Sequence, residues 1–217
     1  MCTSVLMMRT VVHMTRPPPE PPNGHAVEPS AARRARRFDP ERRERILDAA
    51  LDVLAEHGVS GVTHRLIAAQ ADVPLGSVTY HFSTLADLRA QAFERFVADQ
   101  SVQFEQLFQD VRDTEQLVEI LTDLVHAGPS RRRSARLGFE LHLAALRDPE
   151  LRGLTTAWTE HSRRVLARFT SSDNADRLDA LLEGMIMHSL LSTAPEPREK
   201  TRAAIAWALG KADGAGS

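Results

Sequence analysis

The chain has 217 residues, 42% hydrophobic and 26% charged, a composition typical of a globular protein with its own core. Its 27 lysines and arginines against 29 aspartates and glutamates give a net charge of -2, which excludes a polycation that coats nucleic acid but allows a local basic patch. The single cysteine, Cys2, excludes a disulfide framework, and without an apolar run of roughly 18 residues we expect a cytoplasmic protein with no membrane partner.

Residues 1–38 are predicted to be a disordered, partly basic leader. They contain the run PPPEPP, from Pro17 to Pro22, and show no apolar periodicity. Four arginines follow the proline run, at Arg33, Arg34, Arg36 and Arg37. Asp39 and Pro40 then suit the N-cap and the first position of a helix, so the folded part is expected to begin there.

Three helices are predicted between residues 39 and 83. Apolar residues follow the helical period from Ile46 to Leu54, and Gly58 ends this first helix. Thr63 is a suitable cap for a second, shorter helix. The break at residues 72–74 then separates it from a two-turn helix over about residues 74–80.

A second helical domain is predicted over residues 84–213. Thr84 begins a long helix to about Val111, and Asp87 completes a capping-box pattern. Apolar residues recur at helical spacing in five later segments, and the segment around residues 137–146 is apolar on both sides, which predicts a central position. The sequence therefore predicts an all-α protein of about nine helices.

The stretch THRLIAAQADVPLGSVTYHF, residues 63–82, has the pattern of a helix-turn-helix unit, whose second helix can enter the major groove of DNA. Ala68 is small where the two helices approach, Asp72 tolerates the left-handed backbone of the turn, and Val78 points back into the core. An ordinary helical hairpin can show the same three features, so spacing alone leaves both interpretations open.

The predicted outer side of the second helix carries small or hydrogen-bonding residues and no acidic group, as a surface facing phosphates requires. These residues are Leu75, Gly76, Ser77, Thr79, Tyr80 and His81. The leader arginines either reach the DNA backbone or minor groove as an arm, or form a solvated charge run.

A helix ending in Gly58, a Thr-capped helix, the run GSVTYHF and a capped fourth helix together resemble the tetracycline-repressor (TetR) family of bacterial transcription regulators, over about residues 40–90. LHLAALRDPELR, residues 141–152, is similar to a stretch of that family's C-terminal domain. The resemblance implies a homodimer that binds a double-stranded, pseudo-palindromic operator. It also implies a repressor that is released when a small-molecule effector enters the helical C-terminal domain.

The resemblance also implies which residues contact DNA. Thr63 matches a capping threonine that touches phosphate, and Tyr80 matches a position near bases and backbone. The full predicted set is Thr63, Arg65, Leu75, Gly76, Ser77, Thr79, Tyr80 and His81. Thr79 stands where many members have tyrosine, and Leu85 replaces a lysine that supplies a phosphate contact. Arg65 or the leader arginines are candidates to replace that contact.

The ligand pocket implied for the C-terminal domain is predicted from aromatic and polar side chains at helical spacing. The candidates are Phe96, Phe108, Leu121, Phe139, His142, Trp158, His161 and Met185. The alternative for each is plain core packing, although a buried His or Trp needs a polar partner that a ligand can supply. The histidines lie on separate predicted helices without a nearby cysteine, so no metal site and no cofactor are predicted.

The dimer interface is predicted on the last two helices, with the alternative that both apolar stripes cover the subunit's own core. The residues are Leu178, Leu181, Leu182, Ala204, Ile205 and Ala208. The arginines between residues 131 and 136 are interpreted as a solvated segment between helices.

No nucleophile elbow, Walker loop or dinucleotide-binding motif is present, so an enzyme is not predicted. The remaining alternative is a helical module that binds a small molecule or a protein without operator binding.

Overall fold

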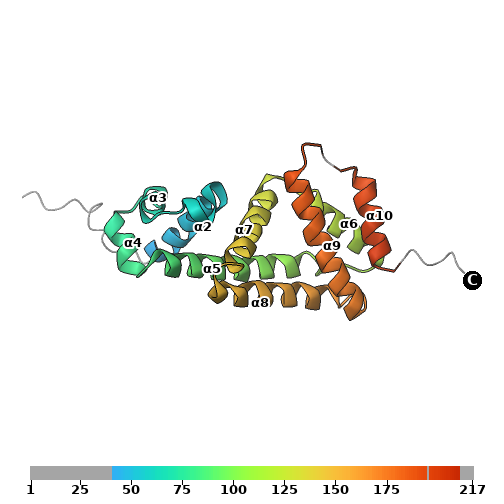
Figure 1. The fold of residues 1–217 in the computed structure, drawn as a ribbon. Coiled ribbons are helices and arrows are strands. Elements are labelled where there is room, and N and C mark those ends of the chain that lie inside the picture. Colours follow the sequence, from blue (N-terminus) through green and yellow to red (C-terminus); the bar gives the residue numbers. More distant parts are fainter. Residues whose placement is uncertain (1–40, 195, 211–217) are drawn as a thin grey trace, which may run out of the picture. The chain divides into compact units, whose positions relative to one another are not determined.

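The computed structural model describes residues 41–194 and 196–210, which form nine α-helices without a strand (Figure 1). The helices are α2 (Arg42–Gly61), α3 (His64–Gln70), α4 (Leu75–His81), α5 (Leu85–Gln106), α6 (Thr114–Val125), α7 (Pro129–Ala145), α8 (Pro149–Leu166), α9 (Ser172–Leu191) and α10 (Arg198–Ala208). The predicted all-α fold is confirmed. The predicted leader, its arginines and the helix start at Asp39 and Pro40 lie outside the described residues. None of the described helices combines the length and the apolarity needed to cross a membrane.

The local signals around the first three helices have the expected geometry. Gly58 interrupts α2 with a φ of +66°, a backbone conformation that favours glycine. The Thr63 hydroxyl accepts a hydrogen bond from the Leu66 N–H at 3.2 Å and so caps α3. Asp72, in the turn between α3 and α4, has a φ of +50°. These three positions fix the lengths and the turn of the helix-turn-helix unit.

Helix α5 begins as predicted but ends earlier. The Thr84 hydroxyl accepts from the Asp87 N–H at 3.0 Å, while the Asp87 carboxylate accepts from the Ser83 N–H at 3.2 Å, one residue before the cap. The hydrogen bond from the Gln91 side chain lowers the pKa of Asp87, which keeps this carboxylate charged at the start of the helix. The helix ends at Gln106 rather than near Val111, because residues 107–110 form turns.

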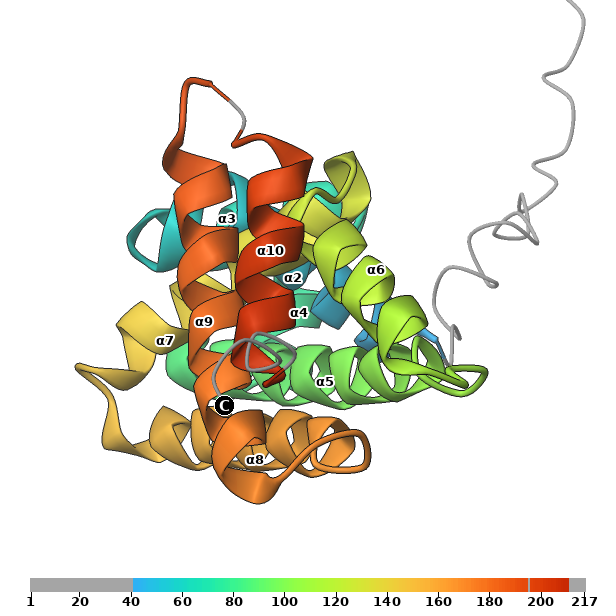
Figure 2. The ribbon, with the colours of Figure 1, turned by 90° about the vertical axis from the view of Figure 1, so that its right-hand side faces the viewer.

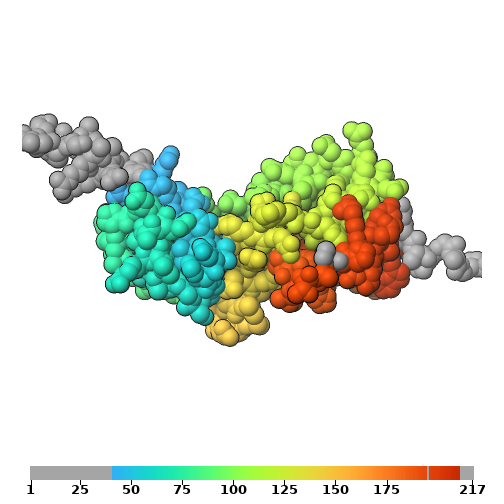
Figure 3. All heavy atoms as spheres, turned by 90° about the horizontal axis from the view of Figure 1, so that it is seen from above, coloured from blue at the N-terminus to red at the C-terminus, as the bar shows by residue number. Residues whose placement is uncertain are grey.

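Two apolar cores are joined by α5 and α8. The first is formed by α2, α3, α4 and the first half of α5, together with Leu137 and Leu141 of α7 and Leu151 of α8. The second is formed by the end of α5, α6, the end of α8, α9 and α10. Trp158 of α8 packs against both cores. Figure 3 shows α7 in yellow between the blue-to-cyan α2–α4 and the red C-terminal helices.

Helix α7 differs from its prediction in two ways. Leu143 and Leu146 on its second apolar side are 54% and 73% exposed, so it is not buried all round. The arginines of residues 131–136 are not a segment between helices but lie within its first two turns. The reason is local, since Gly128 is the N-cap of α7 and Pro129 takes the first helical position, while α6 has already ended at Val125.

Candidate nucleic-acid interface and internal cavity

Helix α4 is anchored to the body along one side. Val78 and Phe82 are fully buried, and the Phe82 N–H donates to the Val78 carbonyl at 3.0 Å, which closes the end of the helix. The guanidinium of Arg43 in α2 lies 5.5 Å from the centre of the Phe82 ring. This seven-residue helix is therefore held by tertiary contacts rather than by its own length.

The opposite side of α4 is free of charged residues and exposed to solvent. Tyr80 is 85% exposed, and its ring makes one contact, an edge-on approach to His81 with 5.2 Å between centres. The Thr79 hydroxyl donates to the Gly76 carbonyl at 3.3 Å, and a Cβ placed on Gly76 would meet nothing within 4 Å. The hydroxyl groups and the phenol can hydrogen-bond to base edges and phosphates, while the open space at Gly76 lets another backbone approach closely.

The structure leaves most of the predicted DNA contacts accessible. Six of the eight are exposed, namely Thr63, Arg65, Leu75, Gly76, Thr79 and Tyr80. The other two, Ser77 and His81, are half-buried. Together they combine the start of α3 with the outer side of α4, which is the surface that a helix-turn-helix unit presents to a duplex.

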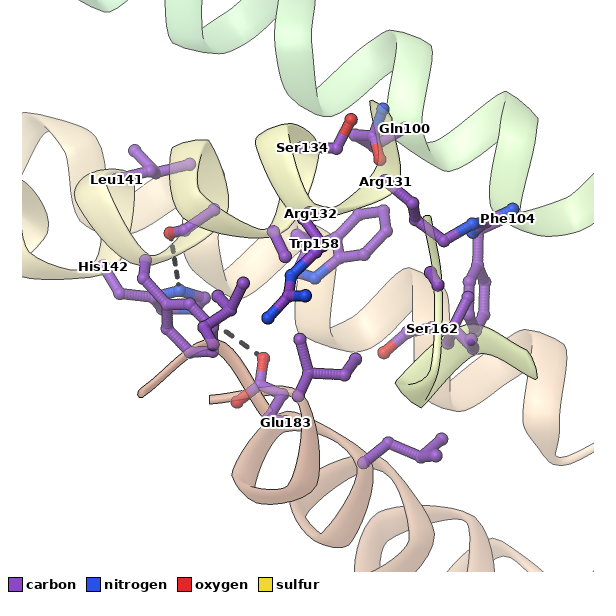
Figure 4. A pocket seen from close by; sticks show the side chains of 18 of the residues that line it. Gln100, Phe104, Arg131, Arg132, Ser134, Leu141, His142, Trp158, Ser162 and Glu183 are labelled. Carbon is purple, nitrogen blue, oxygen red and sulfur yellow. Dashed lines mark hydrogen bonds and ion pairs between the residues drawn. The ribbon is translucent and has the colours of Figure 1, made fainter. Parts of the chain in front are cut away.

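A cavity of about 150 Å³ lies between α5, α7, α8 and α9, with the end of α6 at its edge. Four of the eight predicted ligand residues line it, namely Phe96, Phe139, His142 and Trp158 (Figure 4). Phe104, which was not predicted, adds a ring whose centre lies 5.8 Å from that of Trp158, edge-on. The lining is mostly apolar with a few polar groups, as is usual for a small-molecule site.

The other four predicted ligand residues lie elsewhere. Phe108 and Leu121 are fully buried in the second core, where neighbouring side chains cover the surface that a ligand would have to contact. The ring of His161 donates through Nε2 to the Ser101 carbonyl at 3.1 Å and so ties α8 to α5. Met185 lines a separate cavity of about 370 Å³, where His126 and His188 also lie. The described residues contain no cluster of three potential metal ligands.

The two carboxylates of the cavity have partners within the chain. Asp179 is buried and accepts hydrogen bonds from the Ser162 hydroxyl and, at 3.1 Å, from Arg163 Nε. Glu183 lies 3.8 Å from His142 Nε2, and the other ring nitrogen of His142 donates to the Gly138 carbonyl at 2.9 Å. Burial raises the pKa of Glu183, although His142 acts in the opposite direction.

Two arginines of the cavity were missed by the sequence reasoning. Arg132 donates to the Ser189 carbonyl at 3.0 Å and so links α7 to α9. Arg131 makes no hydrogen bond or ion pair within the part of the chain that the structure describes, and burial lowers its pKa. The signal that could have placed both in a helix is Gly128-Pro129, because a proline suits the first position of a helix.

Helix α7 contacts both the cavity and α2. Gly138, Phe139 and His142 line the cavity, while the Glu140 carboxylate between them accepts a hydrogen bond from the Val59 N–H of α2 at 2.9 Å. A Cβ placed on Gly58 would lie 3.3 Å from the Glu140 carboxylate oxygens. Glu140 therefore contacts the interruption of α2, and the cap of α3 at Thr63 follows that interruption five residues later in the chain.

The predicted dimerisation residues are largely covered by their own chain. Leu178, Leu182, Ile205 and Ala208 are buried in the second core, and Leu181 and Ala204 are half-buried. The four buried side chains have almost no surface left for a partner, which favours the alternative that both stripes cover the subunit's own core. Helices α9 and α10 do lie side by side (Figure 2), but their accessible residues are on the other side. The exposed ones are Ala180, Met187 and Leu191 of α9, with the half-buried Gly184 among them, and Ala203 and Trp207 of α10.

The comparisons with known proteins point to one family. Residues 46–92 match the model described as bacterial regulatory proteins, tetR family, and residues 112–211 match the tetracyclin repressor-like C-terminal domain. The HTH-type transcriptional regulator PksA of Bacillus subtilis (strain 168) is 24% identical over 181 residues, which are 76% of this chain and 86% of PksA.

Two solved structures are similar over nearly their whole length. A TetR-family member from Streptomyces coelicolor A3 is 35% identical with a TM-score of 0.67, and the match covers 78% of this chain and 99% of that one. The multidrug binding protein EbrR in complex with proflavin is 36% identical with a TM-score of 0.61, covering 77% of this chain and 99% of that one.

Proposed function

Because the chain belongs to the tetracycline-repressor (TetR) family of transcriptional regulators, we propose that it is a dimeric repressor, released from its operator when a small molecule enters the cavity. The chain is a DNA-binding regulator with a ligand-binding C-terminal domain. Regulators of this family are transcription factors, and they bind operators and effectors as dimers. What we propose for this chain is that it forms a dimer, that it represses transcription, and that a small molecule releases it from its operator.

Operator binding is assigned to the start of α3 and the outer side of α4. The observation that carries this assignment is Tyr80, a large aromatic residue that is 85% exposed on a helix without a charged residue. An exposed phenol offers a flat apolar ring and a hydroxyl, which suits contact with sugars, phosphates and thymine methyl groups. The rest of the helix is held by Val78 and Phe82, so its outer side is presented in one fixed orientation.

Release is assigned to α7, because this helix joins the cavity wall to α2. A ligand that displaces Phe139 or His142 also shifts Glu140, which holds the Val59 N–H next to the interruption at Gly58. Such a shift changes the position of α3 and α4 relative to the rest of the chain, since both follow Gly58 in sequence. EbrR, solved with proflavin, malachite green and ethidium, supports the small-molecule part of the proposal.

Pairing is assigned to the accessible side of α9 and α10. Ala180, Gly184, Met187 and Leu191 follow each other at spacings of four, three and four residues, so they form one outward stripe. A Cβ on Gly184 would meet nothing within 4 Å, which leaves room for close approach of a second helix. Trp207 on α10 is 70% exposed and adds a large apolar side chain to the same pair of helices.

The operator assignment is tested with duplex DNA selected from a random pool by the full chain. We expect an enriched pseudo-palindrome, and an affinity that falls steeply as salt is raised, because phosphate contacts release counterions. Tyr80→Ala should weaken binding by about 1–3 kcal/mol in a fluorescence anisotropy titration, the scale of one good specific contact. Leu146→Ala, at the exposed apolar C-cap of α7, is the matched control and should bind as the wild type does. Failure to enrich any sequence, or unchanged binding by Tyr80→Ala, would contradict the assignment.

The release step is tested with compounds that raise the melting temperature of the full chain, since a ligand of the folded state stabilises it. Those that bind in the cavity should displace the selected DNA. Glu140→Ala should retain the binding of such a compound but lower its effect on DNA affinity. If the compound displaced the DNA equally from the wild type and from Glu140→Ala, the assignment of the release step to α7 would be wrong.

The pairing surface is tested by sedimentation. Met187→Glu places two charges in an apolar seam of a two-fold dimer, so the dimer should dissociate while the fold is retained. Leu146→Glu, an exposed leucine outside the stripe, is the control. A Met187→Glu chain that remains dimeric at low micromolar concentration would move the interface elsewhere.

A further inference from the structure

The charged residues of the cavity decide which ligands it accepts. Four permanently or partly charged side chains line it in addition to His142, namely Asp179, Glu183, Arg131 and Arg132. An equal number of acids and arginines gives no preference by itself. The preference follows from which of these groups already have partners inside the chain.

Both acids are compensated. Asp179 is bound by the Ser162 hydroxyl and by Arg163, and a second acid, Asp176, lies 3.5 Å from the same Arg163 nitrogen. Glu183 has His142 at 3.8 Å, and burial raises the pKa of Glu183 because it disfavours the charged form. An organic cation entering the cavity would have to compete with these internal partners for either carboxylate.

The arginines are not compensated in the same way. Arg132 donates to the backbone carbonyl of Ser189 and, among the residues that the structure describes, forms no ion pair with a carboxylate. Arg131 has neither a hydrogen bond nor an ion pair with any residue of the described ranges 41–194 and 196–210, although it is half-buried in the wall. A partly buried guanidinium without a partner is unfavourable in the free protein, and a bound anion would remove that penalty.

The surroundings of Arg131 divide the cavity into a polar and an apolar part. Gln100 and Ser134 are drawn close together near Arg131 in Figure 4, and the side chains of both lack a hydrogen bond among the described residues. Phe96, Phe104 and Trp158 supply the aromatic wall. The volume of about 150 Å³ is comparable to that of an engineered apolar cavity that accepts one benzene ring.

We propose that the effector is a small organic anion, a carboxylate with an apolar body of about one aromatic ring, whose carboxylate is bound by Arg131. Gln100 and Ser134 donate further hydrogen bonds to its oxygens, and the ring lies against Phe96, Phe104 and Trp158. The inference rests on the proposed function of the cavity as the effector site and adds the chemical class of the ligand. It predicts that the cavity prefers an organic anion, whereas two free carboxylates would favour an organic cation.

Three probes of one shape test the proposal by calorimetry on the full chain at neutral pH. They are 3-phenylpropionate, 3-phenylpropanamide and 3-phenylpropylammonium, which carry a negative, a neutral and a positive end on the same body. We expect the carboxylate to bind at least about tenfold more tightly than the amide, the scale of a hydrogen bond to a charged group, and the ammonium to bind most weakly. Tightest binding by the ammonium, equal binding of all three, or binding of none would overturn the proposal.

Variants of Arg131 test whether this residue causes the preference for the carboxylate. Arg131→Gln should reduce the affinity for the carboxylate to that of the amide without changing the affinity for the amide, and Arg131→Lys should retain part of the preference. Arg136→Gln, on the same helix but outside the cavity lining, is the matched control, and a thermal melt confirms that each variant is folded. An unchanged carboxylate preference in Arg131→Gln would overturn the assignment.

A final titration separates the two proposals. If the carboxylate binds but leaves the selected DNA bound, the ligand class stands and the release step fails. If the ammonium binds most tightly of the three and displaces the DNA, the release step stands and the ligand class is wrong.

Discussion

The outer side of α4 and the cavity between α5, α7, α8 and α9 place their functional groups in opposite environments. On α4 the groups assigned to DNA point into solvent, and the residues that hold the helix, Val78 and Phe82, point the other way and are fully buried. In the cavity, Asp179 and His142 line the site and also link its helices. Asp179 accepts a hydrogen bond from the Ser162 hydroxyl of α8, and His142 Nε2 lies 3.8 Å from the Glu183 carboxylate of α9.

This difference separates two ways of building a site. On α4, stability and recognition belong to different residues, so a contact residue can change without loss of the fold. In the cavity, Asp179 and His142 serve both, because a buried polar group needs an internal partner whether or not a ligand is present. Mutations on the outer side of α4 should therefore affect one property, while changes at Asp179 or His142 should affect two.

The largest expected effect uses two aromatic residues at the end of α4. Phe82→Ala removes a fully buried ring from the first core and should lower the free energy of unfolding by about 3–5 kcal/mol. Tyr80→Ala, two residues earlier, should change it by less than about 0.5 kcal/mol, because the ring is exposed. Denaturant unfolding of both variants measures the contrast. A similar loss of stability in both would mean that recognition and folding are not separated on this helix.

Much of the first region could be predicted because its signals are local. Thr63 caps α3, Asp72 adopts a positive φ and Gly58 interrupts α2, and each follows from the residue type and its immediate neighbours. The helix-turn-helix unit and the nine helices could be predicted on this basis, and the exposed outer side of α4 follows from where Val78 points.

The second region could be predicted only in part, because a cavity is defined by helices distant in sequence. Phe108 has the same residue type as Phe96 and Phe139, but packing places Phe108 in the second core, together with Leu121, and the other two phenylalanines at the cavity. The same ambiguity applies to α9, where most of the predicted dimer stripe is buried in the subunit's own core. Both sides of that helix are apolar, and burial by α6 and α10 selects Leu178 and Leu182 for the interior.

A smaller effect is expected from two acids that share Arg163. Asp179→Asn weakens a buried network with Ser162 and Arg163, so the free energy of unfolding should fall by about 1–3 kcal/mol. Asp176→Asn changes an exposed carboxylate 3.5 Å from the same arginine and should have an effect below about 1 kcal/mol. Denaturant unfolding of each variant gives the two values. If Asp179→Asn were neutral, the polar wall of the cavity would not support the fold, and the contrast with α4 would disappear.

The smallest expected effect tests whether one residue on the DNA side combines both properties. Thr63 caps α3 through the Leu66 N–H at 3.2 Å and is also assigned to a phosphate contact, whereas Asp113 caps α6 through the Gln116 N–H at 2.8 Å in the C-terminal domain. Replacing either with alanine removes one cap and should lower the free energy of unfolding by about 1 kcal/mol. Only Thr63→Ala should also weaken binding to the selected operator. The two variants lose similar stability, so a difference in their DNA affinity reports the phosphate contact that is assigned to Thr63. Equal DNA affinities for the two variants would restrict Thr63 to capping and leave the α4 side chains to carry recognition.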